Sequence, residues 1–260
     1  MAKYDRIGLT YNQTRKADPY LVTRMAELLD PASNEQFLDI GCGTGNYTLE
    51  LRKHGMTIIG IDPSNEMLQK ARARNKEIDW RQGIAEDIQL PDLSQDGVLA
   101  WLTTHHWTDI DQGFKEVYRI LRPGGRLLIF TSTPEQMELY WLHHYFPNMM
   151  TASGMKMKSE IALTTSLNKA GFSIRKTEPY FVRQDLQDHF LQCGKTNPEV
   201  YFNEEIRNGI SAFSDVANAE EVKLGLAKLR IDMDSGAFNE VVKDYSDKHF
   251  GDYLFLLAIK

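Results

Sequence analysis

A glycine-rich turn between an apolar run and a helical stretch constrains this chain more than any other feature. It reads Leu38-Asp39-Ile40-Gly41-Cys42-Gly43-Thr44-Gly45-Asn46. Glycine allows a sharp backbone turn and lets a ligand approach the main chain closely. A loop of this kind after the first strand of an open α/β sheet lies at the carboxyl end of that strand, where such sheets bind ligands. The loop therefore predicts both a fold class and the position of a binding site.

Short apolar and β-branched runs alternate with helical stretches along the chain. Strands are predicted at 37–40, 57–61, 78–82, 98–102, 126–130, 172–180 and 252–259, and helices at 47–54, 64–74, 109–121 and 158–170. Pro123-Gly124-Gly125 is expected to end the third helix and separate it from the fifth strand. Apolar strands separated by helices predict an α/β fold with a doubly wound, mostly parallel sheet of seven strands.

About 70 residues without clear strand patterning separate the last two predicted strands, and a loop of that length is usually functional or a subdomain. Within it, Val222, Leu226, Leu229 and Met233 are spaced as a helical stripe, which is typical of core packing. We therefore predict two units. Residues 1–180 plus 252–260 form the sheet domain, and residues 181–251 form a mostly helical cap that contributes to the substrate site.

Composition excludes several classes of protein. The net charge of −6 argues against a protein built mainly to grip nucleic acid. The two cysteines, Cys42 and Cys193, are too few for a disulfide scaffold or a four-thiolate zinc site. No apolar stretch approaches the roughly 20 residues of a membrane span, and the first residues lack the apolar core of a signal peptide. We expect a cytoplasmic protein without a nucleic-acid partner; its oligomeric state stays open.

The spacing of the glycines indicates which ligand the loop binds. A dinucleotide fingerprint reads G-x-G-x-x-G, whereas this loop reads G-x-G-x-G and lacks the Gly-Lys-Ser/Thr of a phosphate loop. Asp39 would repel a phosphate, but it suits a ligand with an ammonium group. Asp62, at the end of the second predicted strand, can accept hydrogen bonds from both hydroxyls of a ribose. The alternative for Asp62 is a helix cap before Pro63.

Leu38–Gly45 together with Asp62 resembles the nucleoside-binding half of class I S-adenosylmethionine-dependent methyltransferases. The methyltransferase type 11 group, which includes ubiquinone/menaquinone-biosynthesis and trans-aconitate enzymes, is the nearest subgroup. Gly83-Ile84-Ala85-Glu86-Asp87 is similar to that family's third motif, and residues 120–127 are similar to its strand-five signature. The resemblance spans about residues 35–130. It implies a Rossmann-like methyltransferase domain that binds S-adenosyl-L-methionine and releases S-adenosyl-L-homocysteine.

The resemblance also implies roles for individual residues. Asp39 is nearest the methionine ammonium, Asp62 holds the ribose, and Arg15 pairs with the methionine carboxylate. Alternatives stay open, namely a surface ion pair for Arg15, core packing for Met67 and a solvated loop position for Glu86. The residues implied in cofactor binding are Tyr11, Arg15, Asp39, Gly41, Cys42, Gly43, Gly45, Asp62, Met67, Ala85, Glu86 and Thr103.

Two histidines follow the fourth predicted strand, and His105 and His106 are the candidate catalytic residues. Imidazole titrates near neutrality, so either histidine suits a general base. His106 is favoured because His106-Trp107 resembles the His-Trp pair of type 11 sequences; packing beneath the cofactor is its alternative. No set of further ligands at metal-binding spacing accompanies them, so no metal is expected.

The predicted activity is methyl transfer by direct displacement to a small-molecule acceptor. Glycine spacing disfavours an NAD-linked oxidoreductase. An arsenic methyltransferase needs several acceptor thiols, and only Cys193 lies outside the loop. A non-catalytic S-adenosylmethionine-binding regulatory or assembly module would keep the same motifs and stays an alternative. In the cap, Lys195, Tyr201 and Arg207 suit a small anionic or aromatic acceptor, unless they are solvated surface.

Overall fold

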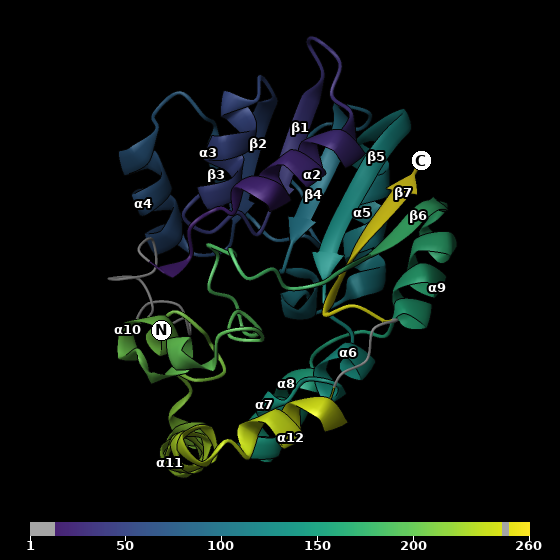
Figure 1. Ribbon diagram of the computed structural model, residues 1–260. Coiled ribbons are helices and arrows are strands. Elements are labelled where there is room, and N and C mark those ends of the chain that lie inside the picture. Colours follow the sequence, from purple (N-terminus) through teal and green to yellow (C-terminus); the bar gives the residue numbers. More distant parts are fainter. Residues whose placement is uncertain (1–13, 246–249) are drawn as a thin grey trace.

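Seven strands form one sheet in the order β3-β2-β1-β4-β5-β7-β6 (Figure 1). The computed structural model describes residues 14–245 and 250–260. Strands β1 to β5 pair in parallel, and β7 is antiparallel to both β5 and β6. The prediction of a seven-stranded, mostly parallel sheet is confirmed. The strands are β1 Gln36–Ile40, β2 Thr57–Asp62, β3 Trp80–Gln82, β4 Gln95–Trp101, β5 Leu121–Thr131, β6 Ser173–Tyr180 and β7 Tyr253–Ile259.

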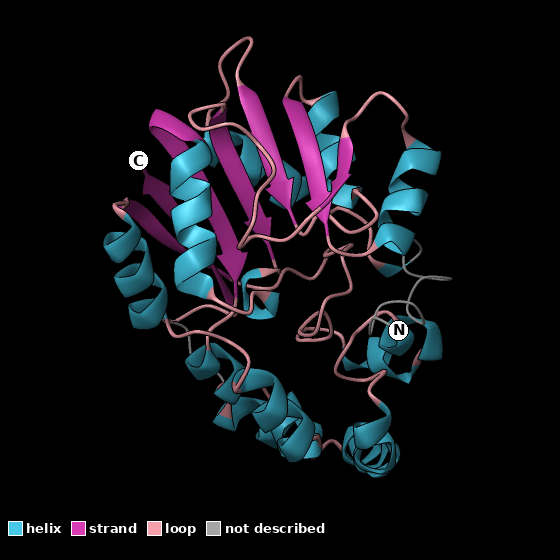
Figure 2. Cartoon of the chain, turned by 180° about the vertical axis from the view of Figure 1, so that it is seen from behind, coloured by secondary structure: helices cyan, strands magenta, loops and turns pink. Residues whose placement is uncertain are grey.

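Helices cover both faces of the sheet because successive strand residues point to opposite sides. Phe37 and Leu99 join the cluster under α2 and α3, whereas Leu38 and Val98 join the cluster under α5 and α9. Figure 2, seen from behind, shows the second of these helical layers in front of the strands. The helices of the sheet domain are α2 Pro19–Leu29, α3 Asn46–Lys53, α4 Asn65–Arg74, α5 Ile110–Ile120 and α9 Glu160–Ala170.

The start of β5 differs from the prediction. The expected break at Pro123-Gly124-Gly125 lies inside this strand, which begins at Leu121 directly after α5. Leu121 pairs with Gln95, and the register then shifts before Gly97 pairs with Arg126. Gly124 N and Gly125 O hydrogen-bond to Lys260 at 2.9 Å each, so the glycines form an irregular stretch held by the end of the chain.

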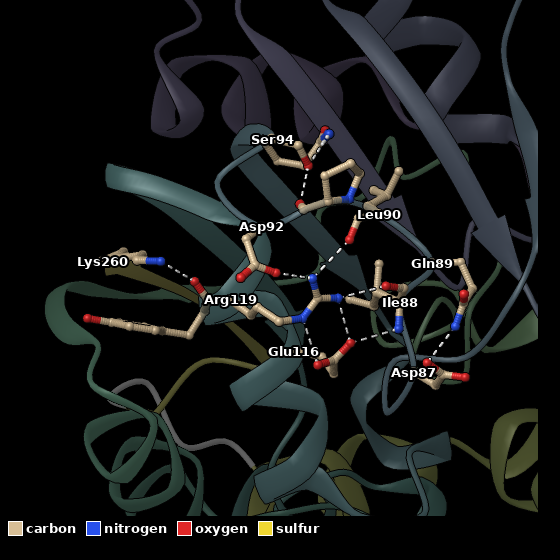
Figure 3. Close-up of polar contacts among 12 residues, drawn as sticks. Asp87, Ile88, Gln89, Leu90, Asp92, Ser94, Glu116, Arg119 and Lys260 are labelled. Carbon is tan, nitrogen blue, oxygen red and sulfur yellow. Dashed lines mark hydrogen bonds and ion pairs between the residues drawn. The ribbon is translucent and has the colours of Figure 1, made fainter.

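Arg119 of α5 holds the connection between β3 and β4 in place (Figure 3). Its guanidinium donates to the carbonyl oxygens of Ile88 at 2.7 Å and Leu90 at 2.9 Å. It also pairs with Glu116, whose carboxylate accepts a hydrogen bond from Ile88 N at 3.0 Å. The loop that precedes Ile88, with Ala85 and Glu86, is thereby fixed against the sheet.

Short helices before α9 pack together with the segment between β6 and β7, and we refer to both as the cap. The sequence prediction assigns residues 134–154 to the sheet domain without helices, yet they form three short helices. The side chains of these helices share one hydrophobic cluster with residues 193–245. Trp141 meets Tyr201 and Phe238 edge to face, and Phe146 meets Phe213. The cap helices are α6 Pro134–Glu138, α7 Leu142–Tyr145, α8 Pro147–Gly154, α10 Glu204–Asn208, α11 Ala219–Ser235 and α12 Phe238–Asp244.

The predicted helical stripe of the cap is confirmed, since Val222, Leu226, Leu229 and Met233 lie on α11 and pack in the cap cluster. The first residues after β6 behave differently, because Val182 and Phe190 pack with the sheet cluster instead. Figure 1 shows the cap helices beyond the arrowheads of β4 and β5, facing the carboxyl ends of the parallel strands. This arrangement leaves the cap over the edge of the sheet at which a ligand is expected.

Candidate functional site

A cavity of about 530 Å³ lies between the carboxyl edge of the sheet and the cap. This volume is in the range of small-molecule sites. Its lining joins the β1–α3 loop, the ends of β2 and β4, residues 188–192, and two parts of the cap at 153–157 and 209–212. Segments far apart in sequence therefore meet at the carboxyl edge of the sheet, where the glycine loop predicts a binding site.

The glycine loop needs glycine for two different reasons. Gly41, Gly43 and Gly45 all have positive φ, at 73°, 55° and 75°, where side chains cause strain. A Cβ on Gly41 would also lie 2.1 Å from Thr103 Oγ1, and one on Gly45 would lie 2.3 Å from the ring of Trp80. A Cβ on Gly43 would meet nothing within 4 Å. Gly41, Cys42, Gly43 and Thr103 line the cavity, whereas Gly45 is not part of the lining.

Asp39 is a buried carboxylate with one partner. Its side chain is 2% exposed, and Thr48 Oγ1 donates to Oδ2 at 2.6 Å. The other oxygen, Oδ1, is buried and has no hydrogen-bond partner among the described residues, and Asp39 is part of the cavity lining. Burial raises the pKa of Asp39 to about 7, with a smaller contribution from the charge of Asp62. An unpaired carboxylate in a desolvated position favours a cationic ligand group.

Asp62 holds the loop and the following helix together. Gly43 N donates to Oδ2 and Ser64 N donates to Oδ1, each at 2.8 Å. Burial raises the pKa of Asp62, while these two hydrogen bonds lower it. The cap of α4 is Ser64, whose hydroxyl accepts from Met67 N at 3.3 Å. Asp62 is therefore not the cap itself, and it lines the cavity with both oxygens already in use on the backbone.

The predicted adenine-side residues divide into two groups. Met67 is buried and lines the cavity. Ala85 and Glu86 are absent from that lining. Ala85 packs in the core under α5, and Glu86 Oε1 accepts from Thr108 N at 2.5 Å and Asp109 N at 3.1 Å. Glu86 thus fixes the chain that leads into α5, rather than standing free in solvent.

His105 and His106 both line the cavity at the end of β4, on a 3₁₀ turn that spans Thr104–His106. Their ring centroids are 3.9 Å apart. Burial lowers the pKa of His105 to about 3, with smaller contributions from the charges of His106, Lys156 and Arg15. His105 is therefore neutral at ordinary pH, and within the part of the chain that the structure describes its buried Nδ1 has no hydrogen-bond partner. His106 is the more exposed of the two.

Arg15 reaches the cavity as part of a buried ion pair. Its Nε lies 2.6 Å from Oδ1 of Asp188, whose side chain is 1% exposed. Tyr47 OH donates to the other oxygen of Asp188 at 3.1 Å. This arrangement differs from the surface ion pair considered as the alternative for Arg15. Tyr11, the other N-terminal residue predicted to bind the cofactor, lies outside the described residues.

The cap residues named from the sequence are not in the lining, and other residues are. Lys195 pairs with Asp252, Tyr201 is fully buried against Tyr140, and Arg207 Nη1 donates to the carbonyl of Tyr201. The cap instead presents Ser153, Lys156, Met157, Ile210, Ser211 and Ala212 to the cavity. Sequence reasoning also missed Trp101, Asp188 and Gln192, because only the fold brings them to the site.

Neither a metal centre nor a membrane span is found among the described residues. In that part of the chain, no group of three or more His, Cys, Asp or Glu residues is arranged to hold a metal ion. No helix among residues 14–245 and 250–260 is long and apolar enough to cross a membrane.

Comparison with known proteins agrees with this geometry. Residues 38–129 match the sequence profile of a methyltransferase domain. An uncharacterized methyltransferase of Mycobacterium tuberculosis is 40% identical over 115 residues, which cover 43% of this chain and 45% of that protein. A demethylmenaquinone methyltransferase of Chlorobaculum parvum is 34% identical over 49% of this chain and 54% of its own length. The chain thus spans about half the length of these curated relatives.

One solved structure extends the likeness to nearly the whole chain. A protein of Anabaena variabilis, described as a methyltransferase from an antibiotic biosynthesis pathway, superposes with a TM-score of 0.84 at 29% identity. The superposition covers 94% of this chain and 98% of that one, so it includes the cap. The fold is therefore that of a class I methyltransferase. Residues 38–129 match the model of a methyltransferase domain, in agreement with the resemblance that the sequence motifs carry.

Proposed function

We propose that this chain transfers a methyl group from S-adenosylmethionine to a small-molecule acceptor held between the sheet and the cap. The observation that carries the proposal is the buried carboxylate of Asp39. Its unpaired Oδ1 lines a cavity that also contains the glycine loop. The ammonium of the methionine moiety can donate a hydrogen bond to this oxygen and neutralise its charge. The residues present therefore fit the cofactor that the fold implies.

The remaining proposed contacts to the cofactor come from residues at the same edge of the sheet. Gly43 has open space where a side chain would stand, which leaves the loop backbone accessible to a ligand. Asp62 fixes Gly43 and the start of α4 with its two oxygens and keeps further lone pairs for the ribose hydroxyls. Met67 supplies an apolar contact. In this proposal the sheet domain binds the cofactor and the cap binds the acceptor.

The cofactor supplies a methyl group that is already activated by the sulfonium charge. The protein therefore needs no covalent nucleophile, and alignment of the acceptor can contribute several kcal/mol. The cap closes over this edge and keeps water from the reacting atoms. His106 is placed to receive a proton from an acceptor that must lose one. His105, whose ring lies next to that of His106 and whose pKa is lowered by burial, is a packing and hydrogen-bonding neighbour in this scheme.

Calorimetry with S-adenosylhomocysteine and with NADH tests the cofactor assignment. We expect micromolar binding of S-adenosylhomocysteine, about −8 kcal/mol, and no binding of NADH. Asp62→Ala removes two backbone contacts and the ribose acceptor, so affinity should fall at least about tenfold while the fold survives. Asp185→Ala, an exposed aspartate outside the cavity lining, is the matched control. NADH binding without S-adenosylhomocysteine binding would reverse the assignment.

A screen for methyl transfer then separates an enzyme from a binding module. The screen combines small carboxylates, phenols and amines with S-adenosylmethionine and follows formation of S-adenosylhomocysteine. Turnover with at least one acceptor supports the enzyme. Tight cofactor binding with no turnover over the whole panel favours the non-catalytic module, which would use the same cofactor residues.

A further inference from the structure

Four side chains in the cavity lining each keep one buried polar atom without a hydrogen-bond partner among the described residues. They are Asp39 Oδ1, Trp101 Nε1, His105 Nδ1 and Gln192 Oε1. Asp39 belongs to the cofactor end of the cavity. Gln192 is different, because its side chain is 0% exposed and it follows β6 in the segment that leads into the cap. A buried amide oxygen without a partner is costly unless a ligand satisfies it.

The orientation of the Gln192 amide follows from its neighbours. Nε2 lies 3.4 Å from Ser132 Oγ and 3.4 Å from the carbonyl oxygen of Asp252. Ser132 Oγ donates its own proton to that same carbonyl at 3.0 Å, so both neighbours act as acceptors. Turning the amide over would bring its oxygen against the carbonyl oxygen of Asp252. Nε2 therefore faces this pair, and Oε1 is the acceptor of this lining residue that has no partner among the described residues.

The backbone of Gln192 is held as well. Its N donates to Tyr253 OH at 3.3 Å, and its carbonyl accepts from Lys195 N at 3.1 Å. The carboxylate of Asp252 pairs with Lys195 and accepts from Val182 N at 2.7 Å. Gln192 is therefore fixed by residues at the end of β5, at the start of β7 and in the chain after β6, and a ligand does not have to order its side chain.

The carboxylates of the described lining all lie away from the cap helices, and the cation Arg15 is paired with one of them, Asp188. The carboxylates of the described lining are Asp39, Asp62 and Asp188, and none of them lies on the cap helices or on the 209–212 segment. The cap side contributes Lys156, and apolar or hydroxyl side chains such as Met157, Ile210 and Ser211 surround it. Lys156 is close enough to His105 to influence the charge on its ring. This side of the cavity therefore favours an apolar ligand with an anionic group and disfavours a protonated amine.

We propose that the acceptor is a small hydroxy acid, whose hydroxyl donates a hydrogen bond to Gln192 Oε1 and whose anionic group pairs with Lys156. The assignment rests on the proposed function, because it describes the second ligand of the same cavity. Gln192 is a specificity-determining residue here, since an amide oxygen can accept a hydrogen bond but cannot remove a proton. A site built around such an acceptor rejects analogues that lack the hydroxyl.

The test measures binding to the wild-type protein saturated with S-adenosylhomocysteine. The probes are the three hydroxybenzoate isomers, benzoate, the three fluorobenzoates, and the aliphatic pair 8-hydroxyoctanoate and octanoate. Fluorine is similar in size to a hydroxyl but has no proton to donate. We expect at least one hydroxyl compound to bind at least tenfold more tightly than its deoxy and fluoro counterparts. If no hydroxyl compound is preferred, or if fluorine serves equally well, the inference is overturned.

Gln192→Met then locates the preference. It should bring the hydroxyl compound and its deoxy counterpart to within about threefold of each other, with S-adenosylhomocysteine affinity unchanged. Gln95→Met is the matched control. Gln95 is also buried with an unpartnered Oε1, but it lies outside the cavity lining, so its variant should keep the preference. Retained preference in Gln192→Met contradicts the assignment. Should this variant not fold, the fluoro comparison in the wild type decides.

Lys156→Met tests whether Lys156 pairs with the anionic group of the acceptor. Lys156 is exposed, so the substitution should leave the fold intact. The wild type should bind the preferred hydroxybenzoate at least tenfold more tightly than the matching hydroxybenzamide, and the variant should bind them within about threefold. Lys158→Met, two residues further on and outside the lining, is the control. An unchanged ratio in Lys156→Met overturns this part. If the wild type fails to bind S-adenosylhomocysteine at all, the proposed function fails first, and that outcome is distinct from the others.

Discussion

A side chain would be crowded to a similar degree at Gly41, in the glycine loop, and at Gly225, in the cap. Only Gly41 also has a positive φ. A Cβ on Gly41 would lie 2.1 Å from Thr103 Oγ1, and one on Gly225 would lie 2.4 Å from a ring carbon of Phe146 and from the carbonyl of Tyr145. Gly41 also has φ at 73°, whereas Gly225 is an ordinary residue of the helix α11.

Gly41 is therefore constrained by backbone conformation as well as by packing, and Gly225 by packing alone. A backbone with positive φ next to a ligand admits few residue types. A packed interface between helices accepts many combinations of apolar residues of the right volume. The family model matches residues 38–129 and stops before the cap, whereas the Anabaena variabilis structure also superposes over the cap. In the proposed function the loop binds the cofactor and the cap binds the acceptor, so the two regions should respond differently to substitution.

The largest expected effect belongs to the chemistry at the end of β4. If His106 removes a proton from the acceptor, His106→Asn should lower turnover by about 10²–10⁴-fold with little change in cofactor affinity. The wild-type pH–rate profile should rise as a histidine loses its proton, and the variant should lack this rise. Steady-state kinetics with an accepted substrate and calorimetry with S-adenosylhomocysteine measure both.

The alternative role of His106 predicts the reverse pattern. If this residue only packs beneath the cofactor, its variant should lose affinity or stability and keep the pH profile. Normal turnover, affinity and stability together would contradict both roles and direct attention to His105 or to the cap.

The next largest effect is expected from a substitution within the glycine loop, Gly41→Ala. Alanine at Gly41 costs about 1–2 kcal/mol for its positive φ and also collides with Thr103. We expect S-adenosylhomocysteine affinity to fall by about 100-fold, or about 2.7 kcal/mol. Gly55→Ala is the control, because Gly55 has φ at 88° but would meet nothing within 4 Å. It should lose stability without losing affinity. Equal affinities in the two variants would remove the distinction between the loop and other tight turns.

The sheet and the loop could be predicted from the sequence because their determinants are local. An apolar run, glycines at alternate positions and a second strand that ends in Asp62 specify β1, the turn and β2 with few alternatives. The cap side of the site depends on contacts between distant segments. Asp188 meets Arg15 across 173 positions, and Gln192 takes its orientation from Ser132 and Asp252. The short helices α6 to α8 have only four to eight residues each, too few for a periodic pattern to show.

A third prediction uses the pKa of Asp39 to examine the loop without changing its shape. This pKa is about 7 in the folded protein, against an ordinary aspartate value of 3.8, so between these values the folded state binds more protons than the unfolded chain. Its contribution to stability is present below pH 3.8 and is lost as the pH rises to 7. A ligand ammonium favours the ionised form. S-adenosylhomocysteine affinity should therefore increase with pH, by up to about tenfold per unit below pH 7, and then level off.

Asp39→Asn is the reference for this titration. Its affinity should be lower and independent of pH over the same range. His105 acts in the opposite direction on stability, since its lowered pKa of about 3 makes stability rise with pH between 3 and 6.5. The contribution of Asp39 is therefore obtained as the difference in the free energy of unfolding between wild type and Asp39→Asn, measured with urea at each pH. If the affinity of the wild type does not vary between about pH 5 and 7, the ammonium is not held by Asp39.

The smallest expected effect concerns Gly225 and separates the two regions most sharply. Glycine to alanine within a helix normally stabilises by about 0.5–1 kcal/mol. Here the added methyl would press α11 away from Phe146 and Tyr145, and such overpacking typically costs about 1–3 kcal/mol. The two segments of the cap should move apart, and the acceptor KM should rise about threefold to tenfold. S-adenosylhomocysteine affinity should stay within about twofold, because the contacts assigned to the cofactor lie on the sheet. Leu224→Ala, at an exposed neighbouring position on the same helix, should change neither quantity. An equal loss of cofactor affinity in Gly225→Ala would mean that the cap also holds the cofactor, and the division between a cofactor region and an acceptor region would not stand.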